Sequence, residues 1–129
     1  MKKYLAVLIF GTFGGICRTA ISNLFVLSNH FPLGTLIVNL IGCFLFSIAI
    51  HYIALTFPLN SDIISGLSVG FVGAFTTFSG LSVDSIILLH SHEYLLLGIY
   101  NSASIIGGIG FAILGILTSQ HLISRREHW

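Results

Sequence analysis

The chain has 129 residues, of which 55% are hydrophobic and only 7% are charged, and its formal net charge is +1. A soluble domain usually carries about a quarter of its residues as charged side chains, and a soluble fold of this length could not bury so much apolar surface. Together with a mean hydropathy of +1.01, this composition excludes a soluble globular domain and predicts an integral membrane protein.

Four apolar segments are long enough to cross a bilayer, which takes roughly 20 mostly apolar residues: 4–27, 33–57, 63–89 and 94–117. Polar and helix-breaking residues separate them, namely Asn29, His30 and Pro32, then Pro58, Asn60 and Asp62, then the residues from His90 to Glu93. The connections are short, so consecutive helices should be antiparallel neighbours. We therefore expect an all-α membrane protein, with residues 1–129 forming a single four-helix transmembrane domain.

The basic residues predict how the chain is inserted. Two lysines precede the first apolar segment, as in a signal peptide, but the apolar run is too long and lacks a small-residue cleavage site, so we expect a retained helix. With four spans, both termini and the 57–63 loop lie on one side, together with Lys2, Lys3, Arg125 and Arg126, while the two opposite loops contain no Lys or Arg. The positive-inside rule then predicts that both termini lie in the cytoplasm. We expect a multi-pass protein of the plasma membrane.

The third segment contains the stretch GFVGAFTTFSG, from Gly70 to Gly80, which is rich in glycine and threonine. Both residues are poor helix formers, so we expect this helix to be broken at its middle. Such a break survives in a membrane where it is buried in protein or lines a polar cavity, and its freed carbonyls can bind a hard cation. Phe78 lies in the same stretch, and in a chain with eleven phenylalanines a packing role is the ordinary interpretation. Only its place in this polar stretch favours a contact between an anion and its ring edge, which carries partial positive charge.

Other polar residues interrupt the first, second and fourth segments. Arg18 is either an interfacial arginine that snorkels to the headgroups or a buried cation that attracts anions or ties helices together, and both interpretations stay open. Asn39 alone favours an interhelical hydrogen bond, although its amide could also donate to an anion. Tyr100 and Ser104 share one helix face at i and i+4, in a stretch whose small residues usually indicate packing.

Several chemistries have little support in this sequence. It contains no carboxylate pair, nucleophile–base pair or phosphate loop, so we do not expect an enzyme. Cys17 and Cys43 lie within predicted helices and are interpreted as packing residues rather than a disulfide or metal site. The four acidic residues are Asp62, Asp84, Glu93 and Glu127, three of them in loops or the tail.

Four stretches, GGICR, GTLIVNLIGCF, GFVGAFTTFSGLS and YNSAS, together resemble the Fluc (CrcB) family of fluoride channels, and the likeness spans all four segments. The resemblance implies a passive fluoride exit route, built as an antiparallel dimer with two pores along the subunit interface and one structural sodium ion. On the matching positions it implies Gly73 and Thr76 as sodium ligands through their backbone carbonyls. It also implies a fluoride pore that includes Asn39, Phe78, Tyr100 and Ser104, with Arg18 as the arginine of the first helix.

The sequence departs from the family pattern at several positions. Leu81 stands where a second aromatic residue is usual, and a leucine has no polarised ring edge for an anion. Asp84 replaces a glutamate, and Gly108 and Ala112 stand where hydroxyl groups would continue the polar track. Because the basic residues also favour a single orientation, we hypothesise that the chain forms one half of a heterodimer with a related, oppositely inserted subunit. A homodimer remains the alternative.

Two other functions are alternatives to a fluoride channel. A small proton-coupled multidrug exporter would need a carboxylate in the first helix, and that helix carries Arg18 instead, which has the wrong sign for cationic drugs. A non-conducting structural subunit that only stabilises a partner is kept open by Leu81.

Overall fold

The computed structural model describes residues 2–25 and 31–126. Asn29 and His30 of the expected first turn, and Glu127 of the tail, lie outside this range. The described chain contains four helices that are long and apolar enough to cross a membrane: Lys2–Leu24, Leu33–Thr56, Ser61–His90 and Tyr94–Arg125. This confirms the prediction of an all-helical protein with four membrane-length apolar helices.

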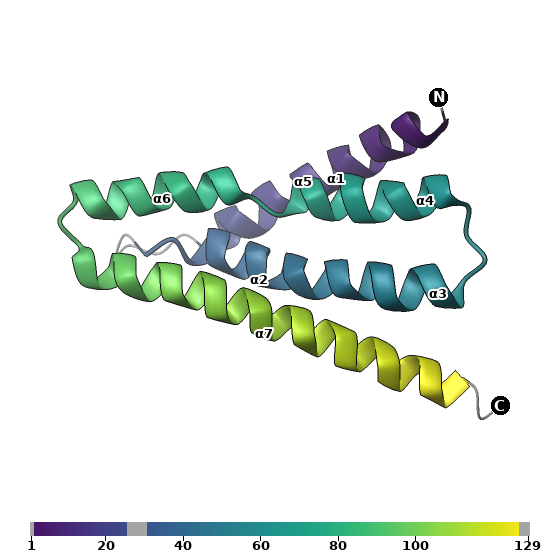
Figure 1. Ribbon diagram of the computed structural model, residues 1–129. Helices are drawn as coiled ribbons and strands as arrows, with labels where there is room; N and C mark the ends of the chain where they lie inside the picture. Colours follow the sequence, from purple (N-terminus) through teal and green to yellow (C-terminus); the bar gives the residue numbers. More distant parts are fainter. Residues whose placement is uncertain (1, 26–30, 127–129) are drawn as a thin grey trace.

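The four spans differ in how regular they are (Figure 1). The first is a single helix, α1 (Lys2–Leu24), and the fourth is a single longer helix, α7 (Tyr94–Arg126), which continues well beyond the apolar segment that ends at residue 117. The second span consists of α2 (Leu33–Ile48), a π-helical turn η1 (Ala49–Ile53) and α3 (Ala54–Thr56). The third consists of α4 (Ser61–Ser65), the π-helical η2 (Gly66–Val72), α5 (Gly73–Phe75) and α6 (Phe78–His90).

Two extended residues separate α5 from α6. Thr76 has φ −79° and ψ 156°, and Thr77 has φ −147° and ψ 114°, so neither continues the helix. In Figure 1 the α4–α5 and α6 halves lie end to end, joined by this short non-helical piece. The β-branched threonines favour an extended backbone, which is why the interruption falls at this point of the glycine- and threonine-rich stretch.

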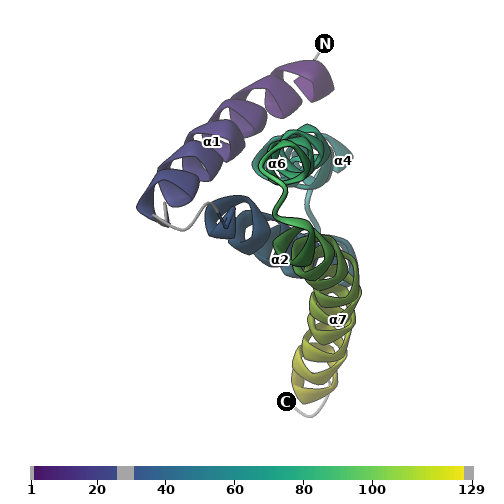
Figure 2. The ribbon, with the colours of Figure 1, turned by 90° about the vertical axis from the view of Figure 1, so that its left-hand side faces the viewer.

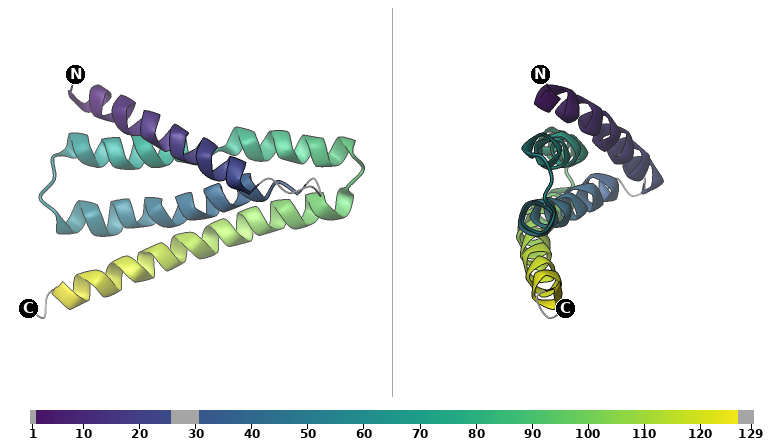
Figure 3. Two further views of the ribbon diagram at one scale, coloured as in Figure 1. Left: turned by 180° about the vertical axis from the view of Figure 1, so that it is seen from behind. Right: turned by 90° about the vertical axis from the view of Figure 1, so that its right-hand side faces the viewer.

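The spans are arranged around α2. Viewed end-on, α2 lies between α1 and α7, and the third span lies beside α1 (Figure 2). α7 packs along α2, whereas α1 packs on α4, η2 and α5 and crosses them at an angle (Figure 3). The start of α1, the end of α7 and the α3–α4 turn all lie at one end of the molecule (Figure 1), as an even number of spans requires.

Glycines allow the backbones of neighbouring spans to approach closely. A Cβ atom at Gly14 would overlap the carbonyl oxygen of Phe71, and one at Gly70 would lie 2.7 Å from the carbonyl oxygen of Val7, so α1 and η2 meet backbone to backbone. Between α2 and α7, a Cβ at Gly115 would lie 2.8 Å from the carbonyl oxygen of Phe44. Such contacts are the usual basis of helix association in membranes, where apolar side chains gain nothing by leaving lipid.

Most of the apolar surface faces outwards. Among the residues that the structure describes, a few large side chains, including Leu36, Leu88 and Tyr100, form a buried core, whereas Phe13, Leu95 and others remain largely exposed. In a membrane protein such a surface contacts lipid or another subunit. A small buried core is therefore consistent with a chain that is 55% hydrophobic.

Candidate functional site

The interruption of the third span is held by Asn39, which lies on the neighbouring helix α2. The Thr77 N–H donates to Asn39 Oδ1 at 2.8 Å, and Asn39 Nδ2 donates to the Thr77 carbonyl at 3.0 Å. One side-chain amide thus satisfies both backbone groups of an extended residue. Unpaired backbone groups are costly at membrane depth, so this pair of hydrogen bonds stabilises the interruption.

Hydrogen bonds around the interruption also redirect two helical donors. In a continuous helix the N–H of Thr77 would donate to the carbonyl of Gly73, and the N–H of Gly80 to the carbonyl of Thr76. Here the Thr77 N–H donates to Asn39, and the Gly80 N–H donates to Thr77 Oγ1 at 3.0 Å, capping α6. The Gly73 and Thr76 carbonyls therefore lose their helical donors.

A cavity of about 490 Å³ opens beside the interruption. Its wall includes five of the predicted site residues, which come from α2, the third span and α7: Asn39, Gly73, Thr76, Phe78 and Ser104. The other lining residues are Gly42, Cys43, Phe46, Val72, Thr77, Leu81 and Ile105. The members from α2 are spaced as one helix face, so α2 presents a single stripe to the cavity.

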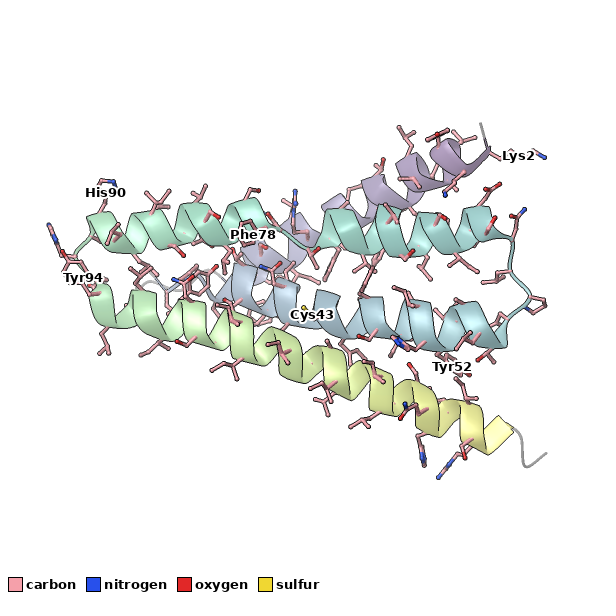
Figure 4. All side chains as sticks on the ribbon, viewed as in Figure 1. Lys2, Cys43, Tyr52, Phe78, His90 and Tyr94 are labelled. Atoms are coloured by element: carbon pink, nitrogen blue, oxygen red, sulfur yellow. The ribbon has the colours of Figure 1, made fainter. Side chains whose placement is uncertain are left out.

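Phe78 stands at the mouth of this cavity. It is the first residue of α6, and 81% of its side chain is exposed. Figure 4 shows Phe78 next to the gap between the two helical halves, and Cys43 midway along α2. Nothing lies within 4 Å of a Cβ placed at Gly73, so this side of the third span is open as well.

Arg18 lies apart from these residues, in a second cavity of about 390 Å³. This cavity is more polar, and its lining is Arg18, Thr19, Ser22, Asn23, Thr77, Ser79, Gly80, Val83 and Asp84. Thr77 belongs to both cavities. The interruption is thus flanked by one mostly apolar cavity with amide and hydroxyl groups and by a polar one with a cation and a carboxylate.

Tyr100 and Ser104 share a face of α7, but only Ser104 is among the residues that line the first cavity. The short turn between α6 and α7 makes these helices antiparallel neighbours, and the Tyr100 hydroxyl donates to Asp84 Oδ2 at 3.1 Å. Tyr100 is fully buried, with Phe31 edge-on at 5.9 Å. Ser104 Oγ donates to the Tyr100 carbonyl at 2.7 Å, so its oxygen remains able to accept.

A family model described as CrcB-like protein, camphor resistance (CrcB), matches residues 5–116, nearly the whole of this arrangement. The chain belongs to the CrcB family. This confirms the family resemblance seen in the four sequence stretches.

Relatives in this family carry a functional name. The chain is 43% identical over 125 residues to a protein of Listeria monocytogenes named fluoride-specific ion channel FluC 2, a match that covers 97% of this chain and 96% of the relative. It is 39% identical over 124 residues to fluoride-specific ion channel FluC 1 of Bacillus cereus, covering 95% and 86%. A FluC 1 of Bacillus anthracis is 40% identical over 129 residues, covering 97% and 94%.

Two residues of the site were not predicted from the sequence as site residues. Gly42 and Cys43 line the cavity, although the sequence pattern indicated only packing for Cys43 and no role for Gly42. The signal that could have found them is their spacing, three and four residues after Asn39, which places all three on one face of α2.

Proposed function

We propose that this chain is a fluoride-specific ion channel through which fluoride leaves the cytoplasm passively. The observation that carries the proposal is the likeness to proteins named fluoride-specific ion channels, at 39–43% identity over nearly the full length. Membership of an ion-channel family also argues against an enzyme. The four membrane-length helices, with an interruption between two cavities, support a passage for a small ion at this point.

The residues beside the interruption suit fluoride. This ion is small and strongly hydrated, so a pore must replace its water with hydrogen-bond donors and polarised ring edges. In our proposal Asn39 and Phe78 provide such groups from the first cavity, Ser104 continues the path along α7, and the buried Tyr100 borders that path one turn away on the same face. Arg18, in the second cavity, supplies positive charge that favours an approaching anion.

We propose further that the carbonyls of Gly73 and Thr76 hold a structural sodium ion, which is not transported. Sodium is a hard cation that prefers oxygen ligands, and the two carbonyls have lost their helical donors to Asn39 and Thr77. The open space around Gly73 leaves room for a second subunit to approach this point. These features fit a cation shared between two subunits.

The proposed assembly is a dimer whose subunits are inserted in opposite directions. Phe78 is largely exposed at the cavity that also contains Leu81, so a partner that covers this face could supply the aromatic ring that Leu81 lacks. Lys2, Lys3 and Arg125 all lie at one end of the molecule, which favours a single orientation with both termini in the cytoplasm. A chain inserted in one orientation cannot pair with an oppositely inserted copy of itself, so we favour a heterodimer. Labelling of a Lys2→Cys variant by an impermeant reagent from outside intact cells would contradict this orientation.

A non-conducting structural subunit is the alternative function, and Leu81 is the observation that favours it. Leu81 lines the same cavity as Phe78, so a pore through this cavity would meet only one aromatic ring from this chain. Such a subunit would stabilise a conducting partner without contributing its own pore.

The test is fluoride efflux from liposomes loaded with potassium fluoride, with valinomycin carrying potassium to balance the charge. The chain is reconstituted alone and then together with any homologue that is encoded beside it, and potassium chloride liposomes serve as the control for selectivity. Efflux from the chain alone would establish a homodimer that tolerates Leu81, and efflux only with the partner would establish the heterodimer. No fluoride efflux in either case, from protein shown to be folded, would overturn the proposed channel function.

A further inference from the structure

Gly42 lies on α2 opposite the interruption of the third span and is buried. A Cβ atom placed on Gly42 would overlap the methyl carbon Cγ2 of Thr76, and it would lie 3.5 Å from Cδ1 of Phe75. The second distance is an ordinary van der Waals contact. The Thr76 methyl group therefore occupies the space that any side chain at position 42 would need.

Thr76 cannot turn this methyl group away without losing the hydrogen bond of its hydroxyl group. Its hydroxyl donates to the Val72 carbonyl at 3.0 Å, and its N–H donates to the same carbonyl at 3.0 Å. A β-branched side chain has few staggered rotamers, so the hydroxyl bond decides where the methyl points. The methyl group is thereby directed at the helix face that has no side chain at position 42.

The contact lies one helical turn from the amide of Asn39, which binds Thr77. Adjacent residues of the interruption are thus attached to the same face of α2 in two ways, Thr77 by hydrogen bonds and Thr76 by close packing. Close packing of this kind resists displacement because interiors have little free volume. Both residues line the cavity of the proposed pore.

We propose that Gly42 is a positioning residue of the channel: the absence of a side chain there lets the Thr76 methyl group fix the interrupted backbone against α2. This inference rests on the proposed channel function. Gly42 does not contact the ion in this account. It acts through Thr76, whose carbonyl is a proposed sodium ligand, and so sets the position of the carbonyls and of the cavity wall.

The test is a double-mutant cycle on fluoride efflux, in whichever assembly conducts. Gly42→Ala should lower the efflux rate about tenfold, because the added methyl must displace Thr76. Thr76→Ser removes only the methyl group that would be overlapped and keeps the hydroxyl. In the Thr76→Ser background, Gly42→Ala should therefore cost less than about threefold, a coupling between neighbouring residues that two independent sites would not show.

Gly110→Ala on α7 is the matched control, because nothing lies within 4 Å of a Cβ at that position. It should leave the efflux rate within about twofold. The inference is overturned if Gly42→Ala conducts as well as the unaltered protein, or if its loss is the same with and without Thr76→Ser. Should Gly42→Ala fail to fold, a folded double variant supports the inference and an unfolded one overturns it.

The thermal unfolding midpoints in detergent are compared for the unaltered protein, Gly42→Ala, Thr76→Ser and the double variant. If the unaltered protein conducts no fluoride, the proposed function fails, but the midpoints still decide the contact. Relief by Thr76→Ser of the stability lost in Gly42→Ala would support the packing of Thr76 on Gly42. Equal losses in the two backgrounds would exclude it.

Discussion

Asn39 illustrates how much of a residue's role depends on its partner. The sequence left two interpretations of this amide open, an interhelical hydrogen bond or a donor to an anion. In the structure both ends of the amide bind Thr77, on another span and 38 residues away in sequence. Position and residue type predicted a polar contact at membrane depth, but they could not identify the backbone that needs it, because that backbone becomes available only where the third span is interrupted.

Phe78 provides a direct test at the scale of single residues. If the edge of its ring faces fluoride in the pore, Phe78→Leu should lower fluoride efflux at least about tenfold, because leucine fills similar space without a polarised edge. The reason is electrostatic, so the variant should keep its unfolding midpoint. Efflux from liposomes, measured against protein content, gives the rate.

Phe13→Leu is the matched control for this variant. Phe13 is also a largely exposed phenylalanine, 60% exposed, but it lies on α1 and is not among the residues that line the two cavities. The Phe13→Leu variant should release fluoride at the rate of the unaltered protein. Equal rates for Phe78→Leu and the unaltered protein would remove Phe78 from the proposed pore.

At the scale of elements, the position of the interruption depends on how the first half of the third span is held. η2 and α5 pack against α1 through glycines, and Gly14 faces the carbonyl of Phe71. The second half, α6, is joined to α7 by a short turn and by the hydrogen bond from Tyr100 to Asp84. The two halves thus have different neighbours, and the extended residues Thr76 and Thr77 lie where the packing changes.

Neighbouring glycines of α1 allow this packing to be tested. Gly14→Ala should destabilise the protein by about 1–3 kcal/mol, because its Cβ would overlap backbone rather than a flexible side chain. Gly15→Ala should not destabilise it, since nothing lies within 4 Å of a Cβ at that position and alanine favours a helix over glycine. Thermal unfolding in detergent compares the two variants, and equal midpoints would show that α1 and η2 are not in close contact.

At the scale of the whole molecule, the proposed dimer and the proposed sodium ion depend on each other. The cavity beside the interruption is bordered by the exposed ring of Phe78 and by open space at Gly73. The two carbonyls proposed for sodium come from one short segment, and a hard cation needs more oxygen ligands than these two carbonyls provide. A second subunit that repeats them from the other side would complete the set, which is why sodium and dimer formation belong to one proposal.

Removal of sodium should therefore weaken the assembly. Protein prepared throughout with N-methylglucamine in place of sodium should unfold at a lower temperature and release fluoride more slowly, because a ligand that binds only the folded state stabilises it. A ligand at about one hundred times its dissociation constant contributes about 2.7 kcal/mol. Potassium at the same ionic strength is the control for salt. Identical unfolding midpoints in sodium, potassium and N-methylglucamine would argue against a structural sodium ion.

The class of the protein could be predicted from the sequence, because the number of spans follows from apolar segments and from the cost of unpaired backbone in lipid, both of which are local properties. The family could be predicted as well, from four stretches that extend along the chain. Three contacts required the folded structure: Asn39 binds Thr77, the Tyr100 hydroxyl donates to Asp84, and Gly42 leaves room for Thr76. Those contacts join residues from different spans, and their geometry depends on how closely two backbones approach. The sequence pattern within one span does not predict that distance.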